Sequence, residues 1–137
     1  MRLIHTSDLH IGSMHHIPHV ERLECTLELA HRERADVIIL AGDVFDHTQI
    51  APEILDECAT LLGSSSIPSV ILPGNHDCLI DGQYMRGHFD NMDSVHVMGC
   101  PGQMNVLRMD DLDVEFWGIP HRDYEPLQPF MDIPSAI

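Results

Sequence analysis

The sequence predicts a single α/β domain built on a parallel sheet. Three apolar segments have the pattern of buried strands: residues 2–8, 36–43 and 68–75. They recur about every thirty residues, which is the spacing of parallel strands joined by right-handed helical crossovers. The run "VIIL" at 37–40 favours a strand that is covered on both faces. The length fits one domain, and we expect residues 1–137 to contain no second domain.

The two segments between these strands have helical periodicity. In residues 20–34 the apolar positions are three or four apart, and charged side chains occupy the other faces. Residues 52–62 repeat this spacing, with Pro52 suited to a first helical turn and Gly63 predicting the end of the helix. We therefore expect the order β-α-β-α-β.

The pattern changes after the third strand. Residues 79–93 are typical of a loop with one helical turn. Three short strands are then expected at residues 94–99, 103–109 and 113–120. The segment "MDDLD" at 109–113 predicts a turn before the last strand, and the chain from Tyr124 onward has no periodicity.

The charge balance excludes one class of function. Net charge is −15, with seven Arg and no Lys, so the surface repels phosphate backbones. A basic nucleic-acid-binding module is therefore excluded. The 22 Asp and Glu and the 11 His instead supply oxygen and nitrogen atoms that can bind cations.

Composition also indicates the compartment. No apolar run approaches the roughly 20 residues of a membrane helix, and the N-terminus does not resemble a signal peptide. The four cysteines are dispersed and form no C-x-x-C pair, which is typical of reduced thiols. We expect a cytoplasmic protein without a membrane partner.

Polar side chains follow each of the first three strands. Asp8 and His10 follow the first, Asp43 the second, and Asn75 with His76 the third. The carboxyl ends of parallel strands meet at one edge of a sheet, where ligands usually bind. In extended backbone, residues two apart point to the same side, which predicts that Asp8 and His10 act together.

This set of residues suits hydrolysis of a phosphate ester by two metal ions. Asp43, on the middle element, is placed to bridge the ions; Asp8 and His10 would complete one site, and Asn75 would offer the other a neutral oxygen. His76 would stabilise the transition state or protonate the leaving group. Nitrogen and oxygen ligation without thiolate favours Mn, Fe or Zn over Ca. We expect two divalent ions, Mn first, with Fe, Zn or Mg as alternatives.

Three motifs resemble those of the calcineurin-like metallophosphoesterase superfamily. They are D-x-H at Asp8-Leu9-His10, G-D-x-x-D at Gly42 to Asp46, and G-N-H-D at Gly74 to Asp77. The stretches "HTSDLHIG", "ADVIILAGDVFD", "IPSVILPGNHD" and "FWGIP" further resemble the SbcD-type DNA-repair exonuclease branch.

The resemblance implies a fold, a reaction and partners. The fold would be a four-layer α-β-β-α sandwich with the metals at one edge of two packed sheets. Relatives in this branch are manganese-dependent nucleases that dimerise and work with a coiled-coil ATPase. We therefore expect DNA as substrate, a homodimer and an SbcC-type ATPase subunit as partner.

The resemblance also assigns roles to residues. Asp8, His10 and Asp43 would hold one ion, Asp43 with Asn75 would hold the other, and His76 would be the catalytic imidazole. Two further carboxylates would orient these ligands: Asp46 and Asp77.

The downstream part of the family pattern is missing. Family members carry a single His after a later strand and then a G-H-x-H pair, whereas residues 122–137 contain no His. "GHFD" at 87–90 comes too soon, so we expect His88 to be a loop residue and His121 to be a solvated imidazole. We expect the chain to be the first half to two thirds of the phosphoesterase domain, with an incomplete second sheet and a tendency to self-associate.

Two alternative functions remain open. The same site could act on a nucleotide or small phosphodiester, which a pocket closed to duplex DNA would favour. The chain could also be a catalytically inert scaffold that binds protein. Inactive relatives commonly lose their ligands, and the five site residues are all present here, which argues against a scaffold.

Overall fold

The structure is a computed structural model, and it describes residues 1–15, 18–80, 87–100 and 105–128. Part of the predicted loop 79–93, the start of the predicted strand 103–109 and the tail beyond residue 128 lie outside the described residues. Within them, the predicted α/β class is confirmed.

The centre of the fold is a four-stranded parallel sheet. Its strands are β1 (Leu3–Thr6), β2 (Val37–Ala41), β3 (Ser69–Leu72) and β4 (Val95–Val97), in the spatial order β1-β2-β3-β4. The register pairs Leu3 with Val37, Ile38 with Ser69 and Ser69 with Val95. The predicted strand 94–99 thus extends the parallel sheet.

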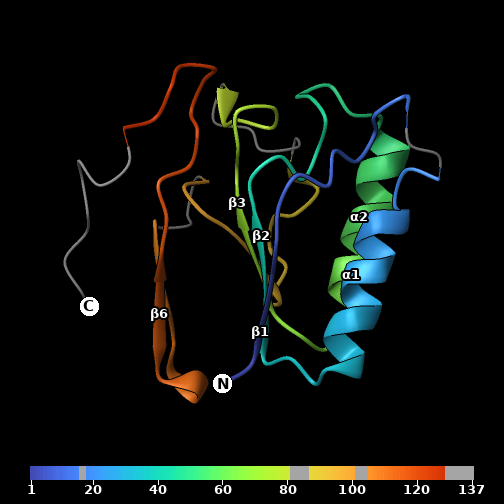
Figure 1. The fold of residues 1–137 in the computed structure, drawn as a ribbon. Coiled ribbons are helices and arrows are strands. Elements are labelled where there is room, and N and C mark those ends of the chain that lie inside the picture. Colours follow the sequence, from blue (N-terminus) through green and yellow to red (C-terminus); the bar gives the residue numbers. More distant parts are fainter. Residues whose placement is uncertain (16–17, 81–86, 101–104, 129–137) are drawn as a thin grey trace.

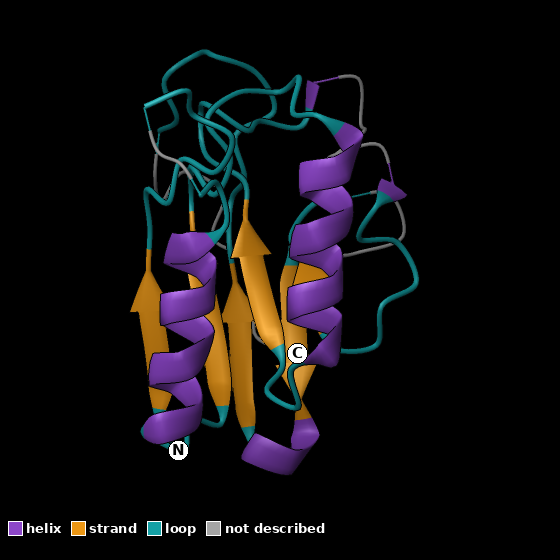
Figure 2. Ribbon diagram, turned by 90° about the vertical axis from the view of Figure 1, so that its right-hand side faces the viewer, coloured by secondary structure: helices purple, strands orange, loops and turns teal. Residues whose placement is uncertain are grey.

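Two helices cover one face of this sheet (Figures 1 and 2). They are α1 (Glu21–Arg32) and α2 (Pro52–Ser64). The apolar positions that predicted them are the buried ones: Leu23, Leu27 and Ala30 in α1, and Leu55, Cys58 and Leu62 in α2. These side chains form the main core with the inward-facing residues of the strands.

Gly63 does not end α2, as the sequence predicted, because the helix continues to Ser64. A Cβ at Gly63 would lie 2.7 Å from Cε of Met92. The glycine therefore allows close packing inside the helix, and the chain leaves the helix at Ser65, whose backbone is extended.

A β-hairpin lies on the opposite face (Figure 1). Strands β5 (Val106–Met109) and β6 (Val114–Trp117) pair antiparallel and are joined by the 3-10 turn η3 (Asp110–Leu112), as predicted for this segment. Partly buried side chains of the hairpin, including Leu107 and Phe116, pack against Val37, Val70 and Met98 of the parallel sheet side. The described residues therefore form three layers: helices, parallel sheet and hairpin.

The strands end earlier than predicted. β1, β2 and β3 stop at Thr6, Ala41 and Leu72, leaving the polar motif residues in the loops beyond them. The loops collect at the edge of the sheet that lies at the top of Figure 1. In the part of the chain that the structure describes, neither helix has the length and apolar composition needed to cross a bilayer.

Candidate metal centre

The loops after β1 and β2 are joined side by side. The amide of Asp8 donates to the carbonyl of Gly42 at 3.0 Å, and the amide of His10 donates to the carbonyl of Asp43 at 3.0 Å. A parallel bridge between Ile11 and Phe45 continues this contact past the strand ends. The two loops therefore hold their motif residues at a fixed separation.

Three motif residues have left-handed backbone. The φ angles are 57° at Asp8, 47° at His10 and 51° at Asp43. The predicted extended backbone at Asp8 and His10 is therefore wrong, since the strand ends at Thr6 and both residues have positive φ. Left-handed backbone costs a non-glycine residue about 1–2 kcal/mol. Backbone of this kind is concentrated at functional sites, where surrounding contacts hold it in place.

Asp8, His10 and Asp43 nevertheless come together. Each offers one ligand atom within 4.8 Å of the other two, and Nε2 of His10 lies 3.9 Å from Oδ1 of Asp8. Asp8 is exposed, while His10 and Asp43 are half-buried. Two carboxylates and one imidazole are a donor set that Mn, Fe and Zn accept.

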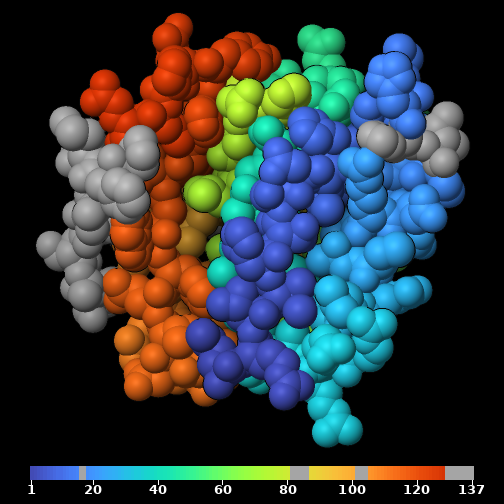
Figure 3. Space-filling model, viewed as in Figure 1, coloured from blue at the N-terminus to red at the C-terminus, as the bar shows by residue number. Residues whose placement is uncertain are grey.

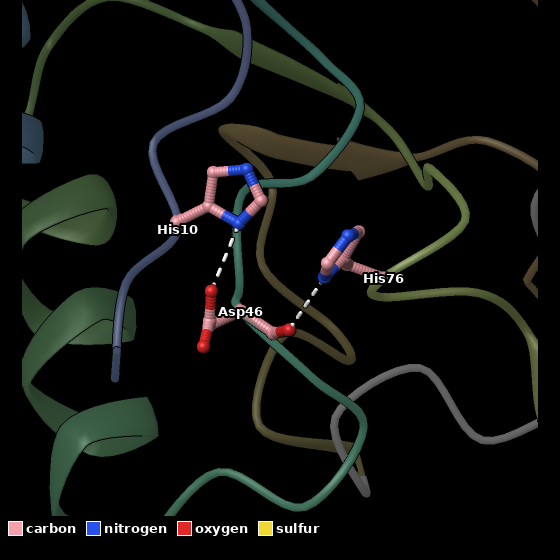
Figure 4. A group of neighbouring side chains, drawn as sticks. All are labelled: His10, Asp46 and His76. Carbon is pink, nitrogen blue, oxygen red and sulfur yellow. Dashed lines mark hydrogen bonds and ion pairs between the residues drawn. The ribbon is translucent and has the colours of Figure 1, made fainter. Parts of the chain in front are cut away.

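Asp46 contacts the two histidines of the site (Figure 4). Its Oδ1 lies 3.0 Å from Nδ1 of His10, and its backbone oxygen lies 2.8 Å from Nδ1 of His76. A carboxylate and a carbonyl only accept, so both Nδ1 atoms donate and both Nε2 atoms of the neutral rings keep a lone pair. Such partners fix the tautomer and orientation of metal-binding histidines.

The two rings are close to each other. Their centroids are 4.9 Å apart with an interplanar angle of 90°. His10, Asp46 and His76 also have ligand atoms within 4.8 Å of one another. Because Asp46 already accepts from Nδ1 of His10, its contacts fit the orienting role that the sequence predicted for it.

Asp77 fixes the loop after β3. It is fully buried, and its carboxylate accepts from the amides of Gly74 at 2.7 Å, Val44 at 2.9 Å and Phe45 at 3.2 Å. These bonds join the G-N-H-D turn to the loop after β2. Asp77 thus positions backbone, rather than the side chain of a ligand.

Asp43 lies against the same turn. The amide of His76 donates to its Oδ1 at 3.0 Å. A Cβ at Gly74 would lie 2.2 Å from that Oδ1 and 2.5 Å from the Asp43 amide nitrogen. Only glycine allows this approach. The side chain of Asp43 therefore contacts the loop after β3, and the loop after β2, which carries Asp43, contacts the loop after β1.

A pocket of about 270 Å³ opens at this edge. Asp8, Asp43 and Asn75 line it, together with His121 and the apolar side chains of Ile119 and Leu127. The structure thus gathers three of the five predicted site residues in one pocket. The other two lie beside them: Nε2 of His10 is 3.9 Å from Oδ1 of Asp8, and the amide of His76 donates to Oδ1 of Asp43.

The two later histidines differ in position. Nδ1 of His88 lies 2.7 Å from Oδ1 of Asp56 on α2, so His88 is bonded to a helix. His121 lines the pocket together with Asp8, Asp43 and Asn75. The only sequence signal for His121 was its place directly after a predicted strand.

The fold and these motif loops define a calcineurin-like phosphoesterase. The model of that family matches residues 1–129, and the chain belongs to it. The resemblance inferred from the three motifs is thereby confirmed.

The chain is also similar to the SbcD subunits of SbcCD nucleases. It is 35% identical over 85 residues to the SbcD subunit of Escherichia coli strain K12, covering 56% of this chain and 21% of that protein. It is 31% identical over 86 residues to the SbcD subunit of Staphylococcus saprophyticus, covering 56% of this chain and 23% of that protein. The chain spans about a fifth of the length of these relatives.

Proposed function

We propose that the chain is a two-metal phosphodiester hydrolase. Asp8, His10 and Asp43 hold one ion, and Asp43 with Asn75 holds the second. The observation that carries the proposal is the convergence of these ligands at one sheet edge, with Asp43 between the loops of β1 and β3. We further propose that residues 1–137 act as a single domain, since the family match spans 1–129.

The chemistry divides between the ions and the protein. When bound, the ions supply Lewis-acid activation of water and of the phosphate. His76 is the catalytic imidazole: the backbone carbonyl of Asp46 accepts its Nδ1–H, which leaves the lone pair of Nε2 to take up a proton from water and pass it to the leaving oxygen. Asp46 and Asp77 keep His10 and the G-N-H-D turn in position.

DNA is the substrate we favour, in a repair nuclease of the SbcD type. The support is the similarity to the SbcD subunits of two SbcCD nucleases. Net charge of −15 leaves few phosphate contacts on this chain, so DNA binding would depend on the ions, a second copy and an SbcC-type ATPase. We propose a homodimer for the same reason, and Mn as the metal.

We propose the cytoplasm as compartment. Cys58 and Cys78 are buried thiols that form no disulfide among the described residues, which suits a reducing environment. Burial raises the pKa of Cys58 to about 12, so this thiol stays protonated.

One observation favours a small phosphodiester or nucleotide as alternative substrate. The pocket at the metal ligands holds about 270 Å³ and has an apolar wall formed by Ile119 and Leu127. Apolar walls with a few polar groups are typical of sites for small ligands.

Hydrolysis of a bis-aryl phosphate in the presence of Mn²⁺ tests the proposal. Asp43→Asn removes the bridging charge but keeps a residue type that tolerates left-handed backbone, and His76→Ala removes the imidazole. Each should lower kcat by about 100-fold or more. His31→Ala, on the exposed end of α1, should leave activity unchanged. Equal activity in all four proteins would refute the assignment.

Substrate choice needs a separate comparison. Linear duplex DNA, single-stranded DNA and cyclic nucleotides should be hydrolysed side by side under the same Mn²⁺ concentration. Preference for either DNA supports the nuclease, whereas preference for cyclic nucleotides supports the alternative.

A further inference from the structure

Arg22 of α1 contacts the loop that carries Asp8 and His10. Its Nη1 donates to the carbonyl oxygen of Leu9, the residue between these two proposed ligands, at 2.9 Å. The side chain thus reaches from the helix to a loop residue 13 positions earlier in the chain. Figure 3 shows the dark-blue N-terminal segment directly against the lighter blue of α1. The bond therefore joins the helical layer to the proposed metal centre.

The loop after β1 is held from two sides. The amides of Asp8 and His10 donate to the carbonyls of Gly42 and Asp43 in the loop after β2. Between them, the side chain of Leu9 is buried in the main core, and its carbonyl accepts from Arg22. The two proposed ligands are therefore fixed to the neighbouring loop by their own amides and to α1 by the residue that separates them.

The backbone of this loop needs such contacts. Asp8 and His10 have φ angles of 57° and 47°, a conformation that residues other than glycine adopt uncommonly. Backbone of this kind persists where the surrounding structure holds it in place. A hydrogen bond from a charged donor is roughly twice as strong as one between neutral groups. Arg22 supplies such a bond at the peptide group that joins Leu9 to His10.

The place of Arg22 in its helix supports a role outside the helix. It is the second residue of α1, whose first turn also contains Glu21 and Glu24. Acidic side chains in a first turn stabilise a helix through its dipole, whereas a cation there opposes the dipole. The charge of Arg22 therefore does not favour the helix that carries it. The bond to Leu9 accounts for a guanidinium at this position.

We propose that Arg22 is a positioning residue for the ion held by Asp8, His10 and Asp43. By holding the carbonyl of Leu9, it keeps the two neighbouring ligands in the binding arrangement before the ion arrives. Binding then does not have to order the loop, which strengthens it. This inference rests on the proposed function, because it concerns the same metal centre.

Calorimetric titration of the full chain with MnCl₂ tests the proposal. Arg22→Met removes the donor but keeps an unbranched side chain of similar helix propensity. It should weaken the binding of one ion by about 10–100-fold, the range found for partners that orient metal ligands. Arg22→Lys keeps a charged donor and should show a smaller shift in the same direction.

Arg32→Met is the matched control. Arg32 lies in the last turn of the same helix and pairs with Glu33 at the surface, so both binding steps should equal those of the wild type. An Mn²⁺ affinity that is unchanged in Arg22→Met would overturn the inference, as would an equal loss in Arg32→Met.

Hydrolysis of a bis-aryl phosphate at increasing Mn²⁺ concentration separates positioning from catalysis. In Arg22→Met the half-saturating Mn²⁺ concentration should rise by the factor measured in calorimetry, and kcat at saturating Mn²⁺ should return to the wild-type value. A kcat that saturating Mn²⁺ does not restore would contradict a positioning role. A wild type that binds two ions and hydrolyses no ester would refute the proposed reaction alone, because the affinities still decide the role of Arg22. A wild type that binds no ion would refute both.

Discussion

At the scale of single residues, the site depends on close approach between two loops. The carboxylate of Asp43 reaches both the loop of β1 and the turn after β3 because its own backbone is left-handed and because Gly74 has no side chain. Neither condition follows from the metal-binding chemistry of Asp43. Both are conformational requirements that place a ligand where that chemistry can operate.

Gly74→Ala tests this close approach. The new Cβ would lie 2.5 Å from the amide nitrogen of Asp43, so backbone has to move and the free energy of unfolding should fall by about 1–3 kcal/mol. Gly63→Ala is the control. Gly63 lies inside α2, and a Cβ there would meet the flexible end of the Met92 side chain rather than backbone. Helix propensity there favours Ala by about 0.5–1 kcal/mol. Urea denaturation should separate the two variants, and equal stability would contradict the steric argument.

Asp77→Asn tests the buried connection between the loops. The carboxylate accepts from the amides of Gly74, Val44 and Phe45, and an Asn side chain turns one acceptor into a donor that faces an amide. We expect a loss of about 2–3 kcal/mol in urea denaturation, as hydrogen bonds to a charged group contribute about 1.5–3 kcal/mol. Asp93→Asn, at an exposed position, should be close to neutral. A neutral Asp77→Asn would mean that the loops are held by other contacts.

The site residues could be predicted because their motifs are local in sequence. Asp8, Asp43 and Asn75 each follow a recognisable strand by a few residues, so parallel topology places them at one edge. His121 cannot be placed by this rule, because the strand before it is β6 of the antiparallel hairpin. Its place depends on two backbone bonds to the loop of β3, and such long-range pairing leaves no local pattern.

At the scale of elements, the order of the strands and helices could be predicted, but the residues at which the strands end could not. The apolar runs predicted β1, β2 and β3, but each strand stops two or three residues before the predicted end. The observed strands are shorter because a strand ends where its backbone leaves the extended region, whatever the apolar pattern. Asp8 and Asp43 have positive φ and therefore cannot continue β1 and β2. Likewise, the pattern predicted the strand of β4 but not its pairing with β3, which is a tertiary contact.

The fourth strand contains a histidine whose burial predicts pH-dependent stability. His96 is half-buried on β4, and burial lowers its pKa from the ordinary value of 6.5. It lines a pocket of about 530 Å³ together with Asp36, Asp110 and Asp111. Because the folded pKa is lower, the unfolded chain binds more protons below pH 6.5. Stability should therefore fall as pH drops below this value, and level off below the folded pKa.

Urea denaturation of the His96→Gln variant at pH 7.5 and 5.5 measures this contribution. Between the two pH values the variant should lose less stability than the wild type, because it lacks the titrating imidazole. Comparing the two proteins cancels the titration of the carboxylates that they share. His31→Gln, an exposed change on α1, should keep the wild-type difference. An identical pH dependence in all three proteins would show that His96 does not contribute.

At the scale of the whole molecule, the negative net charge destabilises the folded state and attracts cations. Net charge of −15 on 137 residues causes self-repulsion, which salt screens over about 10 Å at 0.1 M. Any salt should therefore stabilise the protein to some degree. Specific metal binding adds a second contribution, because ions that bind only the folded state stabilise it by mass action.

Thermal unfolding with MnCl₂ and with NaCl at equal ionic strength separates these contributions. At about 100 times the dissociation constant, Mn²⁺ should add about 2.7 kcal/mol per site beyond the NaCl effect. Asp43→Asn should keep the NaCl increment and lose most of the Mn²⁺ increment, because Asp43 serves both proposed ions. Increments are compared within each protein, so the variant's own stability does not enter. If NaCl alone reproduced the Mn²⁺ increment, the acidic surface would act only as a diffuse cation atmosphere, and the cluster of Asp8, His10 and Asp43 would not be a metal site.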